Sequence, residues 1–161
     1  MLRRLILLRH AKSALATHNL ADHERTLESR GIDDAHLVAS RLAKLYPHPE
    51  LVLCSDAQRT LETWKHVSNY FDSNTAFVQT HDLYESSVTA YVDVINSQKF
   101  NGKCLMVIGH NPTIEKFITI YTTKRLEMSP AYAAILEVQA DSWKQGLENK
   151  GIWELVDLVK C

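Results

Sequence analysis

The feature that most constrains the fold of this chain is a regular alternation between short apolar runs and longer amphipathic stretches. The apolar runs have the length of strands, and the stretches between them repeat apolar residues at helical spacing. The expected strands are Leu5 to Leu8, Leu51 to Cys54, Thr75 to Val78, Cys104 to Ile108, Ala133 to Val138 and Ile152 to Leu158. Strands that alternate with helices predict an α/β fold, with a mostly parallel central sheet flanked by helices.

Helices are expected between these strands. They cover about Asp33 to Tyr46, Asp56 to Phe71 and Val88 to Ile95, with a further helix that opens at the sequence NPTIEKF. Two of the starts carry capping signals. Ser55 and Gln58 fit a capping box, in which the two side chains bond the first free amides of a helix. Asn111 suits an N-cap, and Pro112 suits the first turn because its missing amide hydrogen has no partner to lose there.

The size of the chain predicts one domain over residues 1–161. A chain of 161 residues with 45% hydrophobic residues can bury an ordinary core, and we find no Pro/Gly-rich linker at which to divide it. The formal net charge of -1 argues against a general nucleic-acid binder, since binding to the phosphate backbone usually requires a strong basic excess. A local basic pocket remains compatible with this charge.

The cysteines and the N-terminal segment indicate the compartment. Cys54, Cys104 and Cys161 cannot all pair, and the first two lie in apolar runs where cysteine behaves as a small hydrophobe. The apolar stretch that precedes Arg9 is too short for a signal-peptide core or a membrane span. We therefore expect a cytoplasmic protein without a membrane segment.

Polar clusters follow three of the expected strands. RHAKS follows the first strand, SDAQRT the second and GHNP the fourth. The carboxyl ends of the strands are where open α/β sheets bind ligands, and a helix start there favours an anion. If these ends meet, they bring together Arg9, His10, Arg59 and His110. Because the planar fork of arginine matches phosphate oxygens, phosphate is the expected ligand.

Each cluster alone also has an ordinary interpretation. Arg9 and His10 could be a simple strand exit, Arg59 could lie on a solvated helix face, and GHNP could be a strand-to-helix turn. The conjunction of three such positions, in this order along the chain, favours a functional site.

The motifs LRHAKS, DHERTLESRG, SDAQRT, LYE and GHNP, between Leu5 and about Phe117, together resemble the histidine phosphatase superfamily, which has a phosphoglycerate mutase-like fold. They are most similar to its small SixA-type phosphohistidine phosphatases. The resemblance implies that His10 is the nucleophile and that the phosphate pocket consists of Arg9, Arg25, Arg59 and His110.

Glu85, in LYE, matches the general acid of the mutase branch if the preceding loop aligns without a gap, and otherwise is a surface glutamate. Two departures accompany the resemblance. Ala11 and Lys12 stand where much of the superfamily has glycine, as they often do in SixA-type relatives. Thr26 replaces a common proline, which we expect to loosen its loop and leave Arg25 usable.

The expected function is therefore a phosphohistidine phosphatase that acts on a phosphorylated protein through a covalent phosphohistidine intermediate. The stretch from Val78 to Lys103 is too short for a large helical lid, which predicts an open pocket. Two alternatives remain open. The chain could be a phosphatase for small phosphate esters, or a non-catalytic module that binds phosphate or a phosphoprotein.

We expect neither a cofactor nor a metal, because the arginines and His110 can stabilise the developing charge themselves. The other histidines show no ligand spacing with a convincing partner. They are His18, His23, His36, His48, His66 and His81. The sequence does not indicate the oligomeric state.

Overall fold

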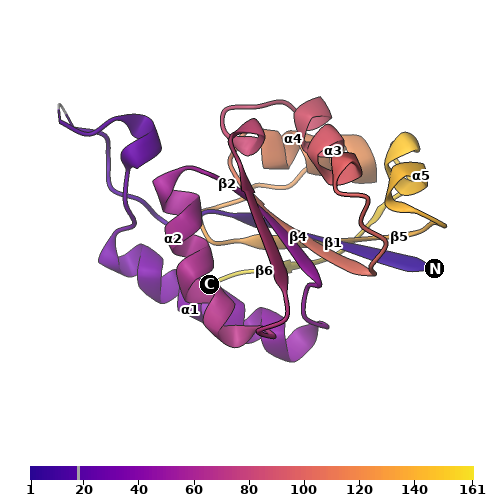
Figure 1. Ribbon diagram of the computed structural model, residues 1–161, viewed down its shortest axis with the longest axis horizontal. Helices are drawn as coiled ribbons and strands as arrows, with labels where there is room; N and C mark the ends of the chain where they lie inside the picture. The colour runs from indigo at the N-terminus through magenta and orange to yellow at the C-terminus, as the bar shows by residue number, and fades with distance from the viewer. Residues whose placement is uncertain (18) are drawn as a thin grey trace.

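The computed structural model, which describes residues 1–17 and 19–161, contains a six-stranded sheet with helices on both faces (Figure 1). The strands are β1 (Leu2–Arg9), β2 (Leu51–Ser55), β3 (Ala76–Thr80), β4 (Cys104–Gly109), β5 (Ala133–Gln139) and β6 (Glu154–Val159). The α-helices are α1 (Ser29–Leu45), α2 (Gln58–Val67), α3 (Val88–Ser97), α4 (Thr113–Thr122) and α5 (Trp143–Glu148). Short 3-10 turns are η1 (Asp22–Glu24), η2 (Ser68–Tyr70) and η3 (His81–Leu83).

The strand order is β3-β2-β4-β1-β5-β6. The first four strands of this order run parallel, and β5 and β6 are added by antiparallel pairing at the β1 side. The register pairs Arg9 of β1 with Gly109 of β4. It also pairs Cys54 of β2 with Ile108 of β4. The carboxyl ends of β1, β2 and β4 therefore meet at one edge of the sheet.

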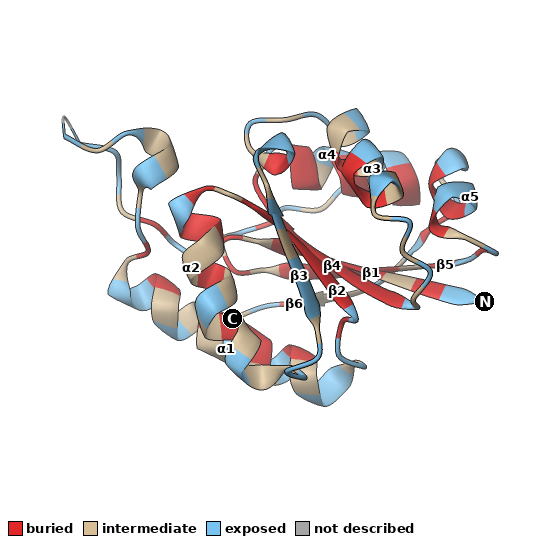
Figure 2. Ribbon diagram, in the orientation of Figure 1, coloured by how far each residue is buried: buried red, intermediate tan, exposed pale blue. Residues whose placement is uncertain are grey.

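The three central parallel strands are buried on both faces because side chains of a strand alternate in direction. Leu5 and Leu7 of β1 pack into a core with α3, α4 and α5. Ile6 and Leu8 of the same strand pack into a second core, with α1 and α2. Figure 2 shows this buried centre and the more exposed edge strand β3. The sheet is consequently held rigidly between two helical layers.

The expected α/β class and all six expected strands are confirmed, with boundaries that move by no more than three residues. Helix α1 begins at Ser29, ahead of the expected Asp33. Helix α5 is absent from the expectation because six residues are too few to establish a helical period. It is fixed instead by Ser142, whose hydroxyl accepts the amide hydrogen of Gln145, and by the buried Trp143.

Both expected caps are wrong. Helix α2 begins at Gln58 with Ala57 as its N-cap, and the Ser55 hydroxyl accepts the amide hydrogen of Ala57 at 3.2 Å. Helix α4 begins at Thr113, and the side-chain amide of Asn111 donates to the Met128 carbonyl at 2.9 Å. Neither Ser55 nor Asn111 therefore accepts an amide hydrogen of the first helical turn, as an N-cap would, although the Asn111 amide also donates to the Glu115 carboxylate of α4 at 3.2 Å.

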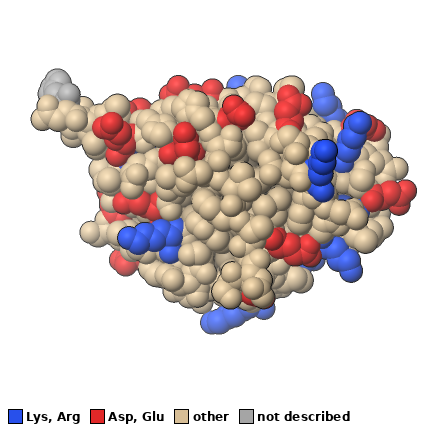
Figure 3. Space-filling model, in the orientation of Figure 1, with Lys and Arg blue, Asp and Glu red and all other residues tan. Residues whose placement is uncertain are grey.

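Charge is mixed on the surface that Figure 3 presents. Asp and Glu side chains are the more frequent over its upper left part, several Lys and Arg side chains lie together at the upper right, and uncharged side chains form its middle. Within the described ranges, no helix has the length and apolar character needed to cross a membrane.

The end of β4 approaches Tyr91 of α3 so closely that only glycine fits at position 109. A Cβ on Gly109 would lie 2.1 Å from the Tyr91 hydroxyl oxygen and 3.0 Å from its Cζ. Tyr91 is fully buried, and its hydroxyl accepts the amide hydrogen of His110 at 3.1 Å. This contact sets the distance between α3 and the strand that carries His110.

We expect Gly109→Ala to lower the free energy of unfolding by roughly 2 to 3 kcal/mol, because overpacking of a rigid site forces strain. Urea unfolding followed by circular dichroism measures this change. Gly146→Ala is the matched control, since a Cβ there meets its nearest neighbour at 3.2 Å and lies within α5. Equal free energies of unfolding for the two variants would contradict the conclusion that only glycine fits against Tyr91 at position 109.

Candidate active site

The site lies at the carboxyl edge of the parallel strands. Strand β1 delivers Arg9 and, one residue on, His10; β4 delivers His110 in the same way. The His10 amide donates to the Gly109 carbonyl at 3.1 Å, which continues the β1–β4 pairing into the site. The rings of His10 and His110 then stand with their centroids 5.3 Å apart. The structure thus brings together the two histidines that the sequence predicts.

His10 has a fixed tautomer. Its Nδ1 lies 2.8 Å from the carbonyl oxygen of Ala11, which can only accept, so Nδ1 carries the hydrogen and Nε2 keeps its lone pair. The residue is 7% exposed. The pKa of His10 is lowered to about 4. Burial is the largest cause, the hydrogen bond to Ala11 opposes it, and the charge of Arg59 adds to it. His10 is therefore a neutral imidazole with a free ring nitrogen at neutral pH.

His110 is held by its other ring nitrogen. Its Nε2 lies 2.8 Å from the Ser55 hydroxyl oxygen. Its Nδ1 is buried and has no hydrogen-bond partner among the described residues. Burial, His10 and Arg59, in that order, lower the pKa of His110 to about 3, so it is also neutral. Because the Ser55 hydroxyl can donate to Nε2, Nδ1 is free to carry a hydrogen and donate it to a ligand.

Arg9 and Arg59 surround the two histidines with unsatisfied donors. Arg9 donates from Nη1 to the Met128 carbonyl at 2.8 Å, and its buried Nε has no partner among the residues described. The buried Nε of Arg59 is unpartnered in the same sense. Burial lowers the pKa of Arg9, which reflects the cost of keeping this cation out of water. An anion that accepts from these groups would relieve that cost.

Asp22 is the counter-charge of the site, and the sequence does not single it out. Its carboxylate accepts from Arg25 at 2.9 Å, from Arg59 at 3.2 Å and from the Tyr84 hydroxyl at 2.5 Å. Hydrogen bonds from Tyr84 and Arg25, together with the charge of Arg59, hold the pKa of Asp22 well below its usual range. The ionised Asp22 therefore fixes both arginines relative to each other.

Arg25 lies beside this group but is engaged by the protein. Besides Asp22, its guanidinium donates to the Ala14 carbonyl at 2.7 Å and to the Ser13 hydroxyl at 2.8 Å. Its charge contributes to the lowered pKa of His10, which indicates that it is close to that ring. Arg25 thus joins the cationic group that the sequence predicts, with fewer free donors than Arg9.

Glu85 is near the site on its solvent side. It lines a pocket of about 470 Å³ together with Arg59, His110, Asp22 and Lys116. Its backbone has a φ of 47°, in the left-handed region, and its side chain is exposed. Tyr84, the residue before it, packs edge-on against the His110 ring at 5.6 Å between centroids. The structure therefore brings Glu85 to the mouth of the site.

Two of the remaining histidines have a partner that the sequence analysis missed. His23 and His81 both bond to Asp56, so the expectation that neither has a convincing partner is wrong. These residues are 33 and 25 positions from Asp56 in the chain, and only the folded loops bring them together. His36 and His66 contact each other through their rings, at 5.0 Å between centroids. His18 lies outside the described residues.

Comparison with known proteins places this arrangement in context. A sequence model of the histidine phosphatase superfamily (branch 1) matches residues 5–98. An uncharacterised chloroplast protein of Arabidopsis thaliana is 32% identical over 174 residues, which cover 98% of this chain and 77% of the relative.

Solved structures share the fold. One from Agrobacterium tumefaciens, provisionally described as the phosphohistidine phosphatase SixA, has a TM-score of 0.82 at 25% identity and covers 99% of this chain and 98% of its own. The protein histidine phosphatase SixA complexed with tungstate has a TM-score of 0.80 at 18% identity, with 98% and 96% covered. A phosphoglycerate mutase from Bacillus anthracis has a TM-score of 0.72 at 16% identity, with 99% and 93% covered.

The pKa values lead to a direct test of the two buried histidines. Both pKa values lie below the ordinary value, so each ring should stay more than about nine-tenths neutral at pH 5.5, and His10 should take up its proton as the pH falls toward 4 and His110 as it falls toward 3. Long-range ¹H–¹⁵N spectra of the imidazoles should also show His10 protonated at Nδ1. The variants His10→Gln and His110→Gln assign the signals. Titration of either ring near pH 6.5 would contradict the structure.

Proposed function

Because the chain belongs to the histidine phosphatase superfamily, we propose that residues 1–161 form one catalytic domain that removes phosphate from phosphohistidine in a protein. The observation that carries the proposal is the state of His10: buried, neutral, and bonded through Nδ1 so that Nε2 is free to attack phosphorus. The likeness to SixA structures supports the phosphoprotein as substrate.

In the first step, the lone pair of His10 Nε2 attacks the phosphorus of the substrate phosphohistidine. A new P–N bond forms to the enzyme as the P–N bond of the substrate breaks, and the leaving imidazole takes up a proton from solvent. In the second step, water attacks the phosphoryl group and gives up a proton to solvent, the bond to His10 breaks, and orthophosphate leaves. His10 returns to its neutral form. One difficult displacement is thereby divided into two easier ones.

The charge that develops on the phosphoryl oxygens is stabilised by the surrounding donors. Three buried side-chain nitrogens have no partner among the described residues: Nε of Arg9, Nε of Arg59 and Nδ1 of His110. Such preorganised donors, aimed at a site where negative charge grows, stabilise the transition state without reorganisation. Arg25 adds long-range positive charge. The tungstate complex of SixA, which holds a tetrahedral oxyanion, supports an oxyanion pocket here.

Asp22 acts in this scheme as a positioning residue. It holds Arg25 and Arg59 in place from the side and lowers the repulsion between them. We propose that the chemistry needs no metal ion, because the guanidinium groups carry out the charge stabilisation that Mg²⁺ performs in many phosphoryl-transfer enzymes.

The openness of the pocket favours a protein substrate. Glu85 is exposed at its mouth, and residues 81–103 form only η3, α3 and short loops. A phosphorylated side chain can therefore approach from solvent. A phosphatase for small esters is the alternative within the superfamily, and a binding module without turnover is the alternative outside enzymes.

The covalent intermediate gives the first functional prediction. Rapid quenching of a reaction with ³²P-labelled phosphohistidine protein should leave an acid-labile, base-stable label on His10, with or without a chelator. His10→Ala should form no label and lose at least about 1,000-fold in kcat/KM, because no covalent intermediate can form.

His48→Ala is the matched control, since His48 lies away from the site and bonds the backbone of Asp72. A His10→Ala variant with most of the wild-type activity would overturn the nucleophile assignment. Dependence of the label on added Mg²⁺ would overturn metal independence. Specific binding of the phosphoprotein with neither label nor orthophosphate release would favour the binding module.

Glu85 gives the second functional prediction, through the need for a general acid. A leaving imidazole protonates near neutral pH, whereas a serine or sugar alkoxide needs a proton at the moment of departure. We therefore expect Glu85→Gln to keep most of the activity on phosphohistidine protein and to slow poor-leaving-group esters much more than aryl phosphates.

Steady-state kcat/KM on the three substrate types measures this pattern. The wild type should also prefer phosphohistidine protein to phosphoserine or a sugar phosphate. A tenfold preference for a small ester, about 1.4 kcal/mol in the transition state, would replace the proposed function by an ester phosphatase. Equal losses on all substrates would make Glu85 a surface or positioning residue.

A further inference from the structure

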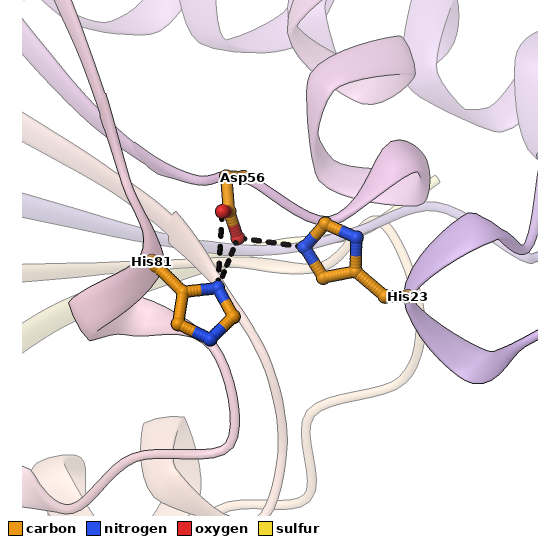
Figure 4. Close-up of side chains that lie close together, drawn as sticks. All are labelled: His23, Asp56 and His81. Atoms are coloured by element: carbon orange, nitrogen blue, oxygen red, sulfur yellow. Dashed lines mark hydrogen bonds and ion pairs between the residues drawn. The ribbon is translucent and has the colours of Figure 1, made fainter.

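Three side chains from three separate loops converge beside the proposed phosphate pocket, and the phosphatase chemistry uses none of them. The His23–Asp56–His81 cluster contains two imidazoles that point at one carboxylate (Figure 4). Nε2 of His23 lies 2.8 Å from Oδ1 of Asp56. Nδ1 of His81 lies 3.1 Å from Oδ1 and 3.0 Å from Oδ2 of the same carboxylate. All three donor atoms lie within 4.8 Å of one another.

The members come from rigid neighbours of the site. His23 belongs to η1, Asp56 follows β2 directly, and His81 begins η3 directly after β3. Strands β2 and β3 are paired in parallel, so Asp56 and His81 are held side by side by the sheet. The cluster is therefore fixed at two of its three positions by backbone hydrogen bonds.

We propose that the His23–Asp56–His81 cluster is a binding site for a divalent transition-metal ion, with Zn²⁺ as the best match. Two imidazole nitrogens and one carboxylate oxygen are a donor set that Zn²⁺ favours. A hard ion such as Mg²⁺ fits poorly, because it prefers oxygen ligands throughout.

The distances suit such an ion after side-chain rotations. Bonds of about 2.0 to 2.1 Å in a tetrahedral site place ligand atoms roughly 3.4 Å apart. The contacts to Asp56 are slightly shorter than this value, and the two histidine nitrogens, no more than 4.8 Å apart, would approach each other by at most about 1.4 Å. Binding replaces the two N–H hydrogens that now face Asp56. In a neutral ring the hydrogen moves to the other nitrogen, and a protonated ring loses one proton.

The cluster is open to solvent on one side. The exposed fractions of the His23, Asp56 and His81 side chains are 37%, 25% and 70%. An ion can therefore enter from solvent on the His81 side, and a water molecule can complete its coordination there.

A metal at this cluster would tie together the loops that hold the phosphate pocket. His23 follows Asp22, the residue that bonds Arg25 and Arg59. The Tyr84 ring packs against His23 at 4.7 Å between centroids and against His110 at 5.6 Å. The site is thus one aromatic ring away from His110. We assign it a stabilising role for these loops, separate from the proposed metal-independent chemistry.

The test is a titration of the full chain with Zn²⁺ alone, after removal of metal by a chelator and in phosphate-free buffer. Isothermal titration calorimetry measures the stoichiometry and the affinity, and thermal unfolding measures the Tm. We expect one Zn²⁺ per chain and a Tm that rises with Zn²⁺. Co²⁺ should give the visible absorption bands of a low-symmetry nitrogen–oxygen site. His23→Gln/His81→Gln should lower Zn²⁺ affinity by at least about 100-fold and abolish the rise in Tm.

Two controls isolate the cluster. His36→Gln/His66→Gln removes a second pair of neighbouring histidines, outside both the cluster and the phosphate pocket, and His10→Gln removes an imidazole at the phosphate pocket. Both variants should keep the wild-type Zn²⁺ affinity. His81→Gln alone changes only an exposed side chain, so it should fold and lower the affinity at least about tenfold.

Absence of stoichiometric Zn²⁺ binding would overturn the proposal. Unchanged affinity in His81→Gln, or loss of affinity in either control, would also overturn it. Because every readout is metal binding or stability, these outcomes are independent of whether the chain proves to be a phosphohistidine phosphatase.

Discussion

The parallel pairing of β1 with β4 is the constraint on which the site depends. The register that sets Arg9 opposite Gly109 also sets His10 next to His110, because each histidine follows its strand by one residue. Burial of both strands on both faces leaves no freedom to slip, since a shift by one residue would turn every core side chain to the opposite face. The positions of His10 and His110 are thus fixed by hydrophobic packing along the strands that precede them.

The site concentrates positive charge and offsets it only in part. Arg25 and Arg59 share Asp22, whereas within the described part of the chain the Arg9 side chain bonds only an uncharged carbonyl, that of Met128. Burial first, and then the positive charge of Arg59, lowers the pKa values of His10 and His110 and keeps both rings neutral, and buried donors are left without partners among the described residues. A site in this state has most to gain from a doubly charged oxyanion. The same unpaired positive charge that makes this pocket costly to form would favour the binding of phosphate, the ligand of the proposed function.

The sequence predicts most of the fold and the central residues of the site, because both follow from short-range patterns. Apolar runs marked the strands, and polar residues directly after them marked Arg9, His10, Arg59 and His110. Asp22 could not be found in this way, because its role depends on the position of η1 above α2 and on Tyr84 from a distant loop.

The caps failed for a related reason. Ser55 and Asn111 occupy cap-like positions in the sequence, but tertiary partners, His110 and Met128, compete for their side chains. In the His23–Asp56–His81 cluster the two histidines are 33 and 25 positions from Asp56 in the sequence, and no local sequence pattern predicts contacts over such separations. Helix α5 is too short for its apolar residues to show the helical spacing that predicts a helix. Long-range contacts therefore account for most of what the sequence did not predict.

The group that orients His10 is a main-chain carbonyl, that of Ala11. Many catalytic histidines are oriented by the carboxylate of a second residue, and a single mutation there destroys the tautomer. Here every amino acid at position 11 carries the same carbonyl, so the orientation of His10, the proposed nucleophile, does not depend on which side chain stands at position 11. The buried side chain at position 11 restricts mainly the size of the residue there. A small residue substituted at this position can therefore leave the Nδ1 hydrogen of His10 in place, with Nε2 free for the proposed attack on phosphorus.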